Sequence, residues 1–292
     1  MLYQFIANHV QEFPIQKQCS VLEVSKTGYY DWLSGRTHQV SAAQAQKREQ
    51  IIITFEHHRS RYGTRRIVAA LADQGLQLSR SKVRGVLQQE GMKAIQPRSF
   101  VPRTTNSRHS YPISPNLLLE RPGLQRVNEV WVGDITYIPL SGGVWAYLSV
   151  WMDLFSRRIV GWELMDNMRE ELVIASMRKA LHDRSPPAGL IVHSDRGGQY
   201  GGKAFRKLLG KGIRQSMSRA GNVYDNAFME SCFSRFKAEL LQGGMFQGIE
   251  DGYTEIFEYI EMYYNTERLH SSIGYKSPLR FEAEYLKSEI PL

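Results

Sequence analysis

The stretch Val130-Trp131-Val132-Gly133-Asp134-Ile135-Thr136-Tyr137-Ile138 decides the fold of this chain. Its β-branched and aromatic residues predict a strand, and side chains alternate along a strand, so Asp134 shares a face with Val130, Val132 and Ile138. A carboxylate on an apolar strand face costs free energy unless a cation or hydrogen bonds compensate for its burial. Asp134 therefore indicates a functional site.

Apolar runs around this strand predict a mixed α/β sheet flanked by helices. Short turns join the first three expected strands, which favours an antiparallel meander, and the later strands alternate with helices. Strands are expected at 129–138, 144–154, 157–164, 190–193 and 213–217. Helices are expected at 170–182, 203–209, 225–241 and 253–268. On the last helix, the side chains expected to form one apolar core stripe are Tyr253, Ile256, Phe257, Ile260, Tyr263 and Tyr264.

Two further acids follow or lie within such elements. Asp195 stands at the C-terminal end of an apolar strand, where open α/β sheets bind ligands. Glu230 lies one helical turn after Asn226, and its helix needs only to cross the sheet edge to bring the carboxylate to the two aspartates. His193 and Asn226 are then expected to line the same site. A single acid is more often a surface or capping residue, but three from separate elements weaken that alternative.

The three carboxylates predict a site for two divalent cations. Phosphodiester cleavage and transfer use one ion to activate the attacking oxygen and another to stabilise the leaving oxygen. Carboxylate oxygens suit Mg²⁺ or Mn²⁺, whereas imidazoles and thiolates favour softer metals. We therefore expect Asp134, Asp195 and Glu230 to be both the metal ligands and the catalytic residues.

The charge of the chain, +8 in total, is unevenly distributed. Residues 1–110 contain 16 Lys and Arg against 7 Asp and Glu, whereas residues 111–292 contain 21 against 22. A basic segment beside a nearly neutral part suggests that one part binds a polyanion and the other performs chemistry. Charge alone is equally consistent with a solvated basic face.

The basic third of the chain contains a helix-turn-helix pattern. A helix is expected from Tyr62 onwards, Gly75 interrupts it, and Ser79 is expected to cap a second helix that buries Val83, Val86 and Leu87. Such a pair presents basic side chains to DNA, although an ordinary helical hairpin has the same pattern. The candidate DNA-binding residues are Arg65, Arg66, Arg80, Lys82 and Arg84. A smaller pattern of this kind is expected at 18–33, with Ser25-Lys26-Thr27-Gly28 as its turn.

Composition shifts divide the chain into five expected segments. Five of the eleven prolines lie between Pro97 and Pro122, so we expect an extended linker that either follows a DNA backbone or simply connects domains. The expected boundaries are 1–45 for an N-terminal helical segment, 46–96 for the helix-turn-helix region, 97–126 for the linker, 127–245 for the catalytic core and 246–292 for a C-terminal helical extension.

The two cysteines, Cys19 and Cys232, lie far apart and form no CxxC pair. This disfavours a disulfide framework and a four-cysteine zinc module, and it fits a reducing cytoplasm. No run reaches the length of a membrane span and no signal peptide is evident, so we expect a cytoplasmic protein with no membrane partner.

From about Arg121 to its end, the chain closely resembles the integrase catalytic core of bacterial insertion-sequence transposases of the OrfB, IS-three type, relatives of retroviral integrases. The core motifs that carry the resemblance are Trp131 to Ile138, Asp153-Leu154-Phe155-Ser156-Arg157, His193 to Tyr200, Ser216-Met217-Ser218 and Tyr224 to Glu230. Outside the core, Tyr62 to Ile67 resembles the family's helix-turn-helix, and Asn265 to His270 with Gly274 and Pro278 resembles its closing motif. Gly201-Gly202 departs from the pattern, because many relatives have a helix-capping Ser or Thr there, and this predicts a looser helix start.

The resemblance implies a ribonuclease H-like fold, preceded by a small all-α helix-turn-helix region. It implies that Asp134, Asp195 and Glu230 form a DDE triad, that Asp153 is a structural acid and that Lys237 contacts DNA. The implied activity is metal-dependent cleavage of double-stranded DNA at the element's ends, followed by strand transfer from the exposed 3′-hydroxyl. The implied partners are the terminal repeats, target DNA, further copies of the chain and an upstream OrfA product or OrfA–OrfB fusion, in the bacterial nucleoid.

Two rival functions remain from the sequence. One is a non-catalytic DNA-binding regulator that uses only the basic third of the chain. The other is a ribonuclease H-like nuclease that hydrolyses DNA without joining it. Metal-dependent nicking distinguishes the first from a transposase, and joined products distinguish the second.

Overall fold

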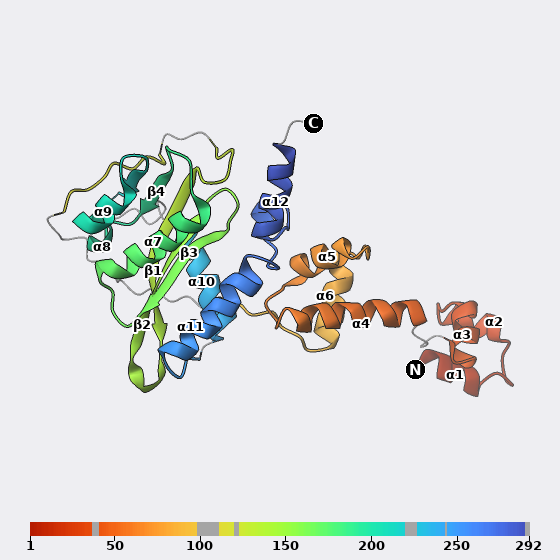
Figure 1. The fold of residues 1–292 in the computed structure, drawn as a ribbon. Helices are drawn as coiled ribbons and strands as arrows, with labels where there is room; N and C mark the ends of the chain where they lie inside the picture. Colours follow the sequence, from red (N-terminus) through yellow and green to blue (C-terminus); the bar gives the residue numbers. More distant parts are fainter. Residues whose placement is uncertain (37–40, 98–110, 120–122, 220–226, 243, 290–292) are drawn as a thin grey trace.

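A five-stranded mixed sheet forms the centre of the larger domain in the computed structural model, which describes residues 1–36, 41–97, 111–119, 123–219, 227–242 and 244–289 (Figure 1). The strand order is β3-β2-β1-β4-β5. The strands are β1 Val130–Pro139, β2 Trp145–Asp153, β3 Ile159–Met165, β4 Ile191–Ser194 and β5 Arg214–Met217. β1, β2 and β3 pair antiparallel, while β4 pairs parallel with both β1 and β5. The predicted meander and mixed sheet are confirmed.

Helices cover both faces of this sheet, and the alternation of β1 decides which side chains meet them. The helices of the domain are α7 Glu170–Arg184, α8 Gly198–Gly201, α9 Lys203–Leu209 and α10 Ala227–Leu241. Trp131 packs in one cluster with side chains of α7 and α9, whereas Val132 packs in the other with Met229 and Phe233 of α10. Since Asp134 shares the face of Val132, it lies on the side of the sheet that α10 covers.

The helix α9 begins differently from the prediction. Gly202, its N-cap residue, offers no side-chain cap, but Glu170 Oε1 of α7 accepts a hydrogen bond of 2.7 Å from the backbone N–H of Phe205. A Cβ atom at Gly202 would collide with the Glu170 carboxylate. The expectation of a loose start is therefore wrong, because a neighbouring helix supplies the missing acceptor.

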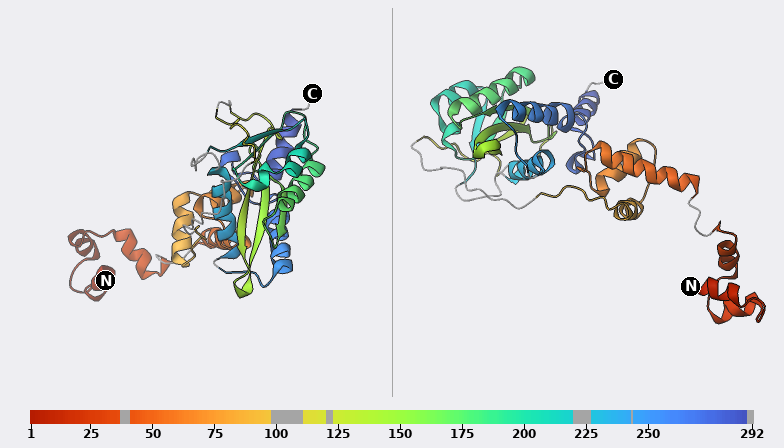
Figure 2. Two further views of the ribbon diagram at one scale, coloured as in Figure 1. Left: turned by 90° about the vertical axis from the view of Figure 1, so that its left-hand side faces the viewer. Right: turned by 90° about the horizontal axis from the view of Figure 1, so that it is seen from below.

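The N-terminal helices form two groups outside the sheet domain, both drawn in red to yellow in Figures 1 and 2. The first group comprises α1 Leu2–Asn8, α2 Ile15–Val21 and α3 Lys26–Leu33, around a small core of Ile6, Cys19 and Tyr29. The predicted turn at 25–28 is wrong in extent. Ser25 accepts a hydrogen bond from the Gly28 N–H, which caps α3, so Lys26 to Gly28 form the first helical turn.

The second group contains the helix-turn-helix pair, whose prediction is confirmed. It comprises α4 Ala42–His57, α5 Thr64–Asp73 and α6 Arg80–Gln89. Gly75 has a φ of +83° in the turn, and Ser79 caps α6 by accepting from the Lys82 N–H at 3.2 Å. The side chains buried between these helices include Ile67, Leu71, Val83, Val86 and Leu87.

The chain ends in α11 Ile249–Phe257, a π-helical turn over Glu258–Tyr264 and α12 Pro278–Ser288. The predicted apolar stripe is correct for Ile256, Ile260, Tyr263 and Tyr264, which are buried, and wrong for Tyr253 and Phe257, which are exposed. Tyr253 instead packs at the edge of β3, with its ring centroid 4.9 Å from that of Trp162.

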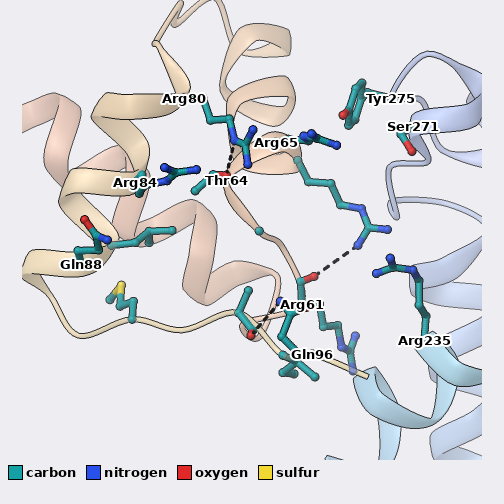
Figure 3. A pocket seen from close by; sticks show the side chains of 16 residues that line it. Arg61, Thr64, Arg65, Arg80, Arg84, Gln88, Gln96, Arg235, Ser271 and Tyr275 are labelled. Atoms are coloured by element: carbon teal, nitrogen blue, oxygen red, sulfur yellow. Dashed lines mark hydrogen bonds between the residues drawn. The ribbon is translucent and has the colours of Figure 1, made fainter. Parts of the chain in front are cut away.

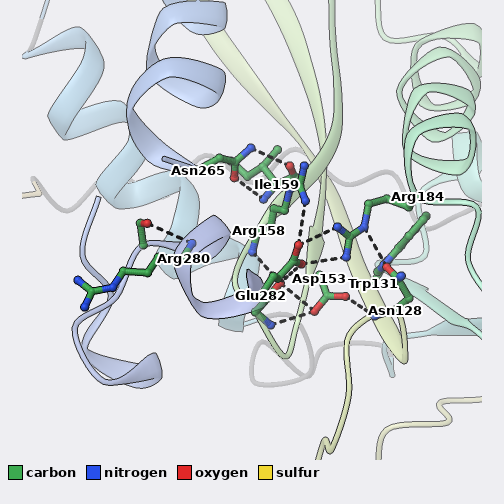
Figure 4. Close-up of polar contacts among 11 residues, drawn as sticks. Asn128, Trp131, Asp153, Arg158, Ile159, Arg184, Asn265, Arg280 and Glu282 are labelled. Carbon is green, nitrogen blue, oxygen red and sulfur yellow. Dashed lines mark hydrogen bonds and ion pairs between the residues drawn. The ribbon is translucent and has the colours of Figure 1, made fainter. Parts of the chain in front are cut away.

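A buried polar cluster ties α12 to the sheet (Figure 4). Glu282 of α12 accepts hydrogen bonds from both terminal nitrogens of Arg184, at 2.8 and 2.9 Å, and from Arg158 at 2.8 Å. Beside it, Asp153 Oδ2 accepts from the Asn128 N–H at 2.6 Å, and Asp153 Oδ1 accepts from the Ser156 N–H at 2.9 Å. Asp153 therefore has the structural role expected of it.

Candidate active site and nucleic-acid interface

Asp134 is the electrostatic centre of the candidate active site. One of its oxygens accepts a hydrogen bond of 2.8 Å from the Ile135 N–H. Burial raises the pKa of the Asp134 carboxyl well above its usual value, and the negative charges of Asp195 and Glu230 raise it further. The ammonium of Lys237 acts in the opposite direction. All three groups therefore lie close enough to Asp134 to affect its charge.

The parallel pairing of β1 and β4 explains why Asp195 lies near Asp134. Val132 pairs with His193, and each aspartate follows its paired residue by two positions, so the two carboxylates leave neighbouring strands at the same level. Asp195 Oδ1 accepts a hydrogen bond of 3.0 Å from the Gly197 N–H. The position at the C-terminal end of β4 is the one that the sequence predicted.

The helix α10 brings Glu230 and Lys237 to the same face. It packs against β1 through Phe233 and Phe236, and Lys237 follows Glu230 by two helical turns. Burial lowers the pKa of the Lys237 ammonium, while the Asp134 carboxylate opposes that change. Asn226, the other residue expected here, lies outside the described residues.

His193 lies in the core of the sheet domain. Its side chain is fully buried, its Nδ1 lies 2.8 Å from the Ser216 hydroxyl and its Nε2 lies 3.2 Å from the Ser218 hydroxyl. These contacts join β4 to β5 and the segment after it. The imidazole therefore holds the strand that carries Asp195, and a place for His193 beside the site stays a prediction.

Tyr200 is a neighbour of the carboxylates that the sequence did not reveal. Its buried hydroxyl has no hydrogen-bond partner among the described residues. Burial raises the pKa of this phenol well above its usual value, and the charges of Asp134 and Asp195 add to the effect. Its ring packs edge-on against Trp151 at 5.7 Å. The helix α8 that carries it was not predicted, so only its place five residues after Asp195 could have indicated it.

A basic groove of about 550 Å³ lies where the helix-turn-helix pair meets the sheet domain (Figure 3). The arginines that line it are Arg61, Arg65, Arg66, Arg80, Arg84 and Arg235. Three of the predicted DNA-binding residues, Arg65, Arg80 and Arg84, are exposed there. Lys82 is exposed on α6 but does not line the groove, whereas Arg61 and Arg235 were not expected from the sequence.

Arg66 differs from the other predicted DNA-binding residues. Its guanidinium lies 3.5 Å from Glu239 Oε1 and donates a hydrogen bond of 3.4 Å to the Arg61 carbonyl oxygen. Burial lowers its pKa, as does the nearby charge of Arg268. These contacts place Arg66 in the junction between the domains.

Buried polar contacts join the helix-turn-helix group to α10 and the C-terminal segment. Glu239 of α10 accepts hydrogen bonds of 2.7 and 2.6 Å from Arg268 and one of 2.8 Å from the Tyr259 hydroxyl. Arg61 donates to the Glu239 carbonyl oxygen at 3.2 Å. The Tyr62 hydroxyl donates a hydrogen bond of 3.2 Å to the Glu267 carbonyl oxygen, and it accepts one of 2.8 Å from the Leu269 N–H.

A second group with suitable metal ligands lies at the same junction. His57, His58 and Glu267 each offer one ligand atom, and these atoms lie within 4.8 Å of one another. This group does not include the three carboxylates. His58 is buried and stacks on Tyr62 at a centroid distance of 3.6 Å, while His57 and Glu267 are exposed.

Comparison with known proteins finds two kinds of family model that match the chain. Residues 125–223 and 211–278 match two models described as Integrase core domain, and residues 42–100 match the HTH-like domain. The sheet, its carboxylates and the basic helical group thus define a DNA-binding polynucleotidyl transferase with an integrase core.

Two curated relatives identify the family. The "Insertion element IS600 uncharacterized 31 kDa protein" of Shigella sonnei is 38% identical over 91% of this chain and 98% of its own length. The "Transposase InsF for insertion sequence IS3A" of Escherichia coli strain K12 is 36% identical over 98% of this chain and 100% of its own length. The chain belongs to the insertion-sequence transposases of the IS3 type, and its activity is that of a transposase.

Solved structures are more distant. The simian T-cell lymphotropic virus intasome is 18% identical, covers 80% of this chain and 73% of its own, and has a TM-score of 0.46. The HTLV-2 integrase catalytic core domain in complex with magnesium is 15% identical, covers 53% of this chain and 96% of its own, and has a TM-score of 0.40. In the part of the chain that the structure describes, no helix is both long and apolar enough to cross a lipid bilayer.

Proposed function

We propose that Asp134, Asp195 and Glu230 are the catalytic carboxylates of this transposase and together bind two divalent cations, Mg²⁺ or Mn²⁺. The observation that carries the proposal is the convergence of charge on Asp134, whose carboxyl pKa is raised by burial and by the other two acids. Three elements, β1, the end of β4 and α10, supply one acid each. A stability role does not account for three like charges at one place.

The donor set fits such ions. The three acids offer only oxygen ligands, which are those that Mg²⁺ and Mn²⁺ prefer. Cations would also neutralise the repulsion that raises the pKa of Asp134. When bound, such a pair lowers the pKa of an attacking water or hydroxyl and stabilises the leaving oxygen.

The roles of the protein side chains follow from their positions. Asp134, whose carboxyl pKa is affected by both other acids, would hold the ions together with Asp195 and Glu230. Lys237, on the same face of α10, would contact a phosphate of the bound DNA beside the scissile bond. Arg65, Arg80, Lys82 and Arg84 would hold the terminal repeat at the helix-turn-helix pair, and we keep Arg66 as a weaker candidate because of its ion pair.

The reaction consists of two displacements at phosphorus. Water first attacks the phosphodiester at the element's end, the P–O3′ bond breaks, and a free 3′-hydroxyl leaves. That hydroxyl then attacks a second phosphodiester in line, forming a new P–O3′ bond and releasing another 3′-hydroxyl. No covalent bond to the protein forms, so the side chains need only to bind, orient and exclude bulk water.

The chemistry on two DNA ends also motivates proposals about assembly. We propose that the chain self-associates on DNA and acts together with an upstream OrfA product or as an OrfA–OrfB fusion, at the bacterial nucleoid. The five segments 1–45, 46–96, 97–126, 127–245 and 246–292 remain our proposed domain division.

The test is incubation of the full chain with end-labelled DNA that carries the element's terminal repeats, in the presence of Mg²⁺. We expect nicked and joined strands, and we expect Asp134→Asn, Asp195→Asn and Glu230→Gln to reduce both. The reduction should exceed the roughly 100-fold loss caused by removing an outer-shell partner of a metal site. Asp166→Asn, which changes an exposed acid after β3, is the matched control and should retain activity.

The products separate the rival functions. Nicking without joining would make the chain a nuclease, and binding without nicking would make it a regulator. If the chain alone gives no product, the fusion with the upstream partner is tested next. Activity in the fusion that survives the substitutions would refute the proposed triad.

A further inference from the structure

We propose that the basic groove between the helix-turn-helix pair and α10 binds the phosphate backbone of one DNA duplex, and that Arg235 of the catalytic domain is one of its binding residues. The proposal rests on the proposed function in taking DNA as the substrate. It goes further by assigning this groove as a site held jointly by two domains.

The groove carries uncompensated positive charge. Six arginines line the groove, and none of its lining residues within the described ranges is acidic. Arg66 is paired with Glu239, and Arg61 donates to a backbone carbonyl. By contrast, Arg65, Arg84 and Arg235 are exposed and form no ion pair with any residue that the structure describes. Clustered cations repel one another, so a polyanion binding here would be stabilised.

The charged side chains that line the groove are all arginines. Guanidinium groups bind phosphate with two parallel hydrogen bonds, which a lysine ammonium does not do. Polar groups complete the lining at both sides, with Gln88 from α6 and Ser271 and Tyr275 from the C-terminal segment. Pockets for small organic ligands are mostly apolar, and this groove is not. The chemistry therefore favours a phosphodiester backbone.

The arginines of the groove come from two domains. Arg65 and Arg84 come from α5 and α6, while Arg235 comes from α10, five residues after Glu230 (Figure 3). The ion pair of Arg66 with Glu239, and the hydrogen bond of Arg61 to the Glu239 carbonyl oxygen, join α5 and the segment before it to α10. A duplex in the groove would thus touch the helix that also carries a catalytic carboxylate.

The experiment measures DNA binding without catalysis. The full chain carrying Asp195→Asn is titrated against a fluorescein-labelled terminal-repeat duplex and an unrelated duplex, without divalent ions, at a series of salt concentrations. Arg84→Gln and Arg235→Gln are compared with Arg178→Gln, which changes an exposed arginine of α7 on the other face of the sheet. The melting temperature of each variant is measured to verify folding.

We expect each groove variant to weaken binding to both duplexes and to reduce the slope of log K against log salt by about 1, because one phosphate contact is lost. The double variant should reduce the slope by about 2. Arg178→Gln should bind both duplexes with the affinity and salt dependence of the parent. If Arg84→Gln weakens binding and Arg235→Gln does not, the helix pair alone binds DNA and the joint site is refuted.

If the groove binds something other than DNA, both variants will bind the duplexes with the same affinity and salt dependence as the parent. That result would also refute the proposal. The result is independent of the catalytic proposal, because DNA binding is measured without divalent ions and requires no cleavage. Nicking that survives the triad substitutions, together with intact groove binding, would refute the triad and leave the groove in place.

Discussion

A single residue, Asp134, shows the conflict between stability and function. Its strand is among the most apolar of the chain, yet the carboxylate lies on the face covered by α10 and beside two other acids. The fold gains nothing from this charge without a cation. Functional sites commonly carry groups that lower stability in this way.

We therefore predict that Asp134→Asn raises the melting temperature in the absence of divalent ions while it abolishes strand transfer. The amide removes the buried charge and its repulsion, and each kcal/mol gained corresponds to about 2–4 °C for a chain of this size class. The measurement is thermal unfolding with and without Mg²⁺.

Added Mg²⁺ should raise the melting temperature of the parent and have less effect on the variant, since a ligand stabilises the state that binds it. Asp166→Asn again serves as the control. A lower melting temperature for Asp134→Asn in metal-free buffer would show that the carboxylate contributes to stability.

The residues that sequence reasoning found are those whose local pattern conflicts with their neighbours. Asp134 was predicted because an acid interrupts an apolar strand, and Asp195 because it ends one. Tyr200 and Arg235 were missed because their roles depend on tertiary contacts, with a buried cluster in one case and a groove between domains in the other. The contacts of His193 were also missed, because its serine partners lie more than twenty residues further along the chain.

At the level of elements, the caps explain where helices begin. Ser79 caps α6 through a local hydrogen bond, as the sequence predicted, and Ser25 caps α3 in the same way at a position where a turn was expected. The cap of α9 comes from Glu170, 35 residues before Phe205, and no local pattern shows it. The positions of β1 to β4 were predicted well because these strands are largely apolar and bounded by turns, whereas α8 lies in a glycine-rich segment that gave no helical periodicity.

We predict that Gly202→Ser destabilises the protein by about 1–3 kcal/mol, although serine normally favours a helix N-cap. The new Cβ atom would collide with the Glu170 carboxylate and displace it from the Phe205 N–H. Chemical denaturation measures the free energy of unfolding of parent and variant.

Gly248→Ser is the matched control, because Gly248 is also an N-cap glycine without a side-chain cap and has open space around its Cβ position. This change should be neutral or stabilising. Equal destabilisation by both substitutions would mean that the collision with the Glu170 carboxylate is not the cause of the loss at Gly202.

For the whole molecule, three buried groups contribute to the response to acid. The pKa of Glu239 is lowered by its hydrogen bonds and ion pair with Arg268 against the opposing effect of burial, and that of Glu282 is lowered in the same way by Arg184. Their stabilising contribution is present above the ordinary carboxyl pKa and is lost as pH falls through the folded-state values. Burial lowers the pKa of His58 to about 4.

His58 should therefore cause a loss of stability at a higher pH than the two glutamates do. Its folded pKa lies below the unfolded value of 6.5, so the unfolded chain binds the extra proton first, and stability falls between pH 6.5 and about 4. We predict that His58→Phe flattens this part of the stability curve, measured by denaturation over a pH series.

A phenyl ring can keep the stacking on Tyr62, and the Nδ1 atom that it removes has no hydrogen-bond partner among the described residues. His182→Gln, at an exposed position, is the control and should leave the curve unchanged. An unchanged curve for His58→Phe would assign the acid sensitivity to other groups.

The buried contacts of Glu239 with Arg268, and of Arg61 with the same stretch of α10, have a consequence for the geometry of the DNA. Because one helix carries both Arg235 of the groove and the proposed catalytic acid Glu230, the protein would fix the separation between the bound DNA backbone and the scissile phosphate. The enzyme would thus select a fixed distance along the DNA. An extra base pair between the bound sequence and the end of the element would rotate the scissile bond around the DNA axis and move it away from the carboxylates. The element's boundary would then be defined by distance as well as by the bases read.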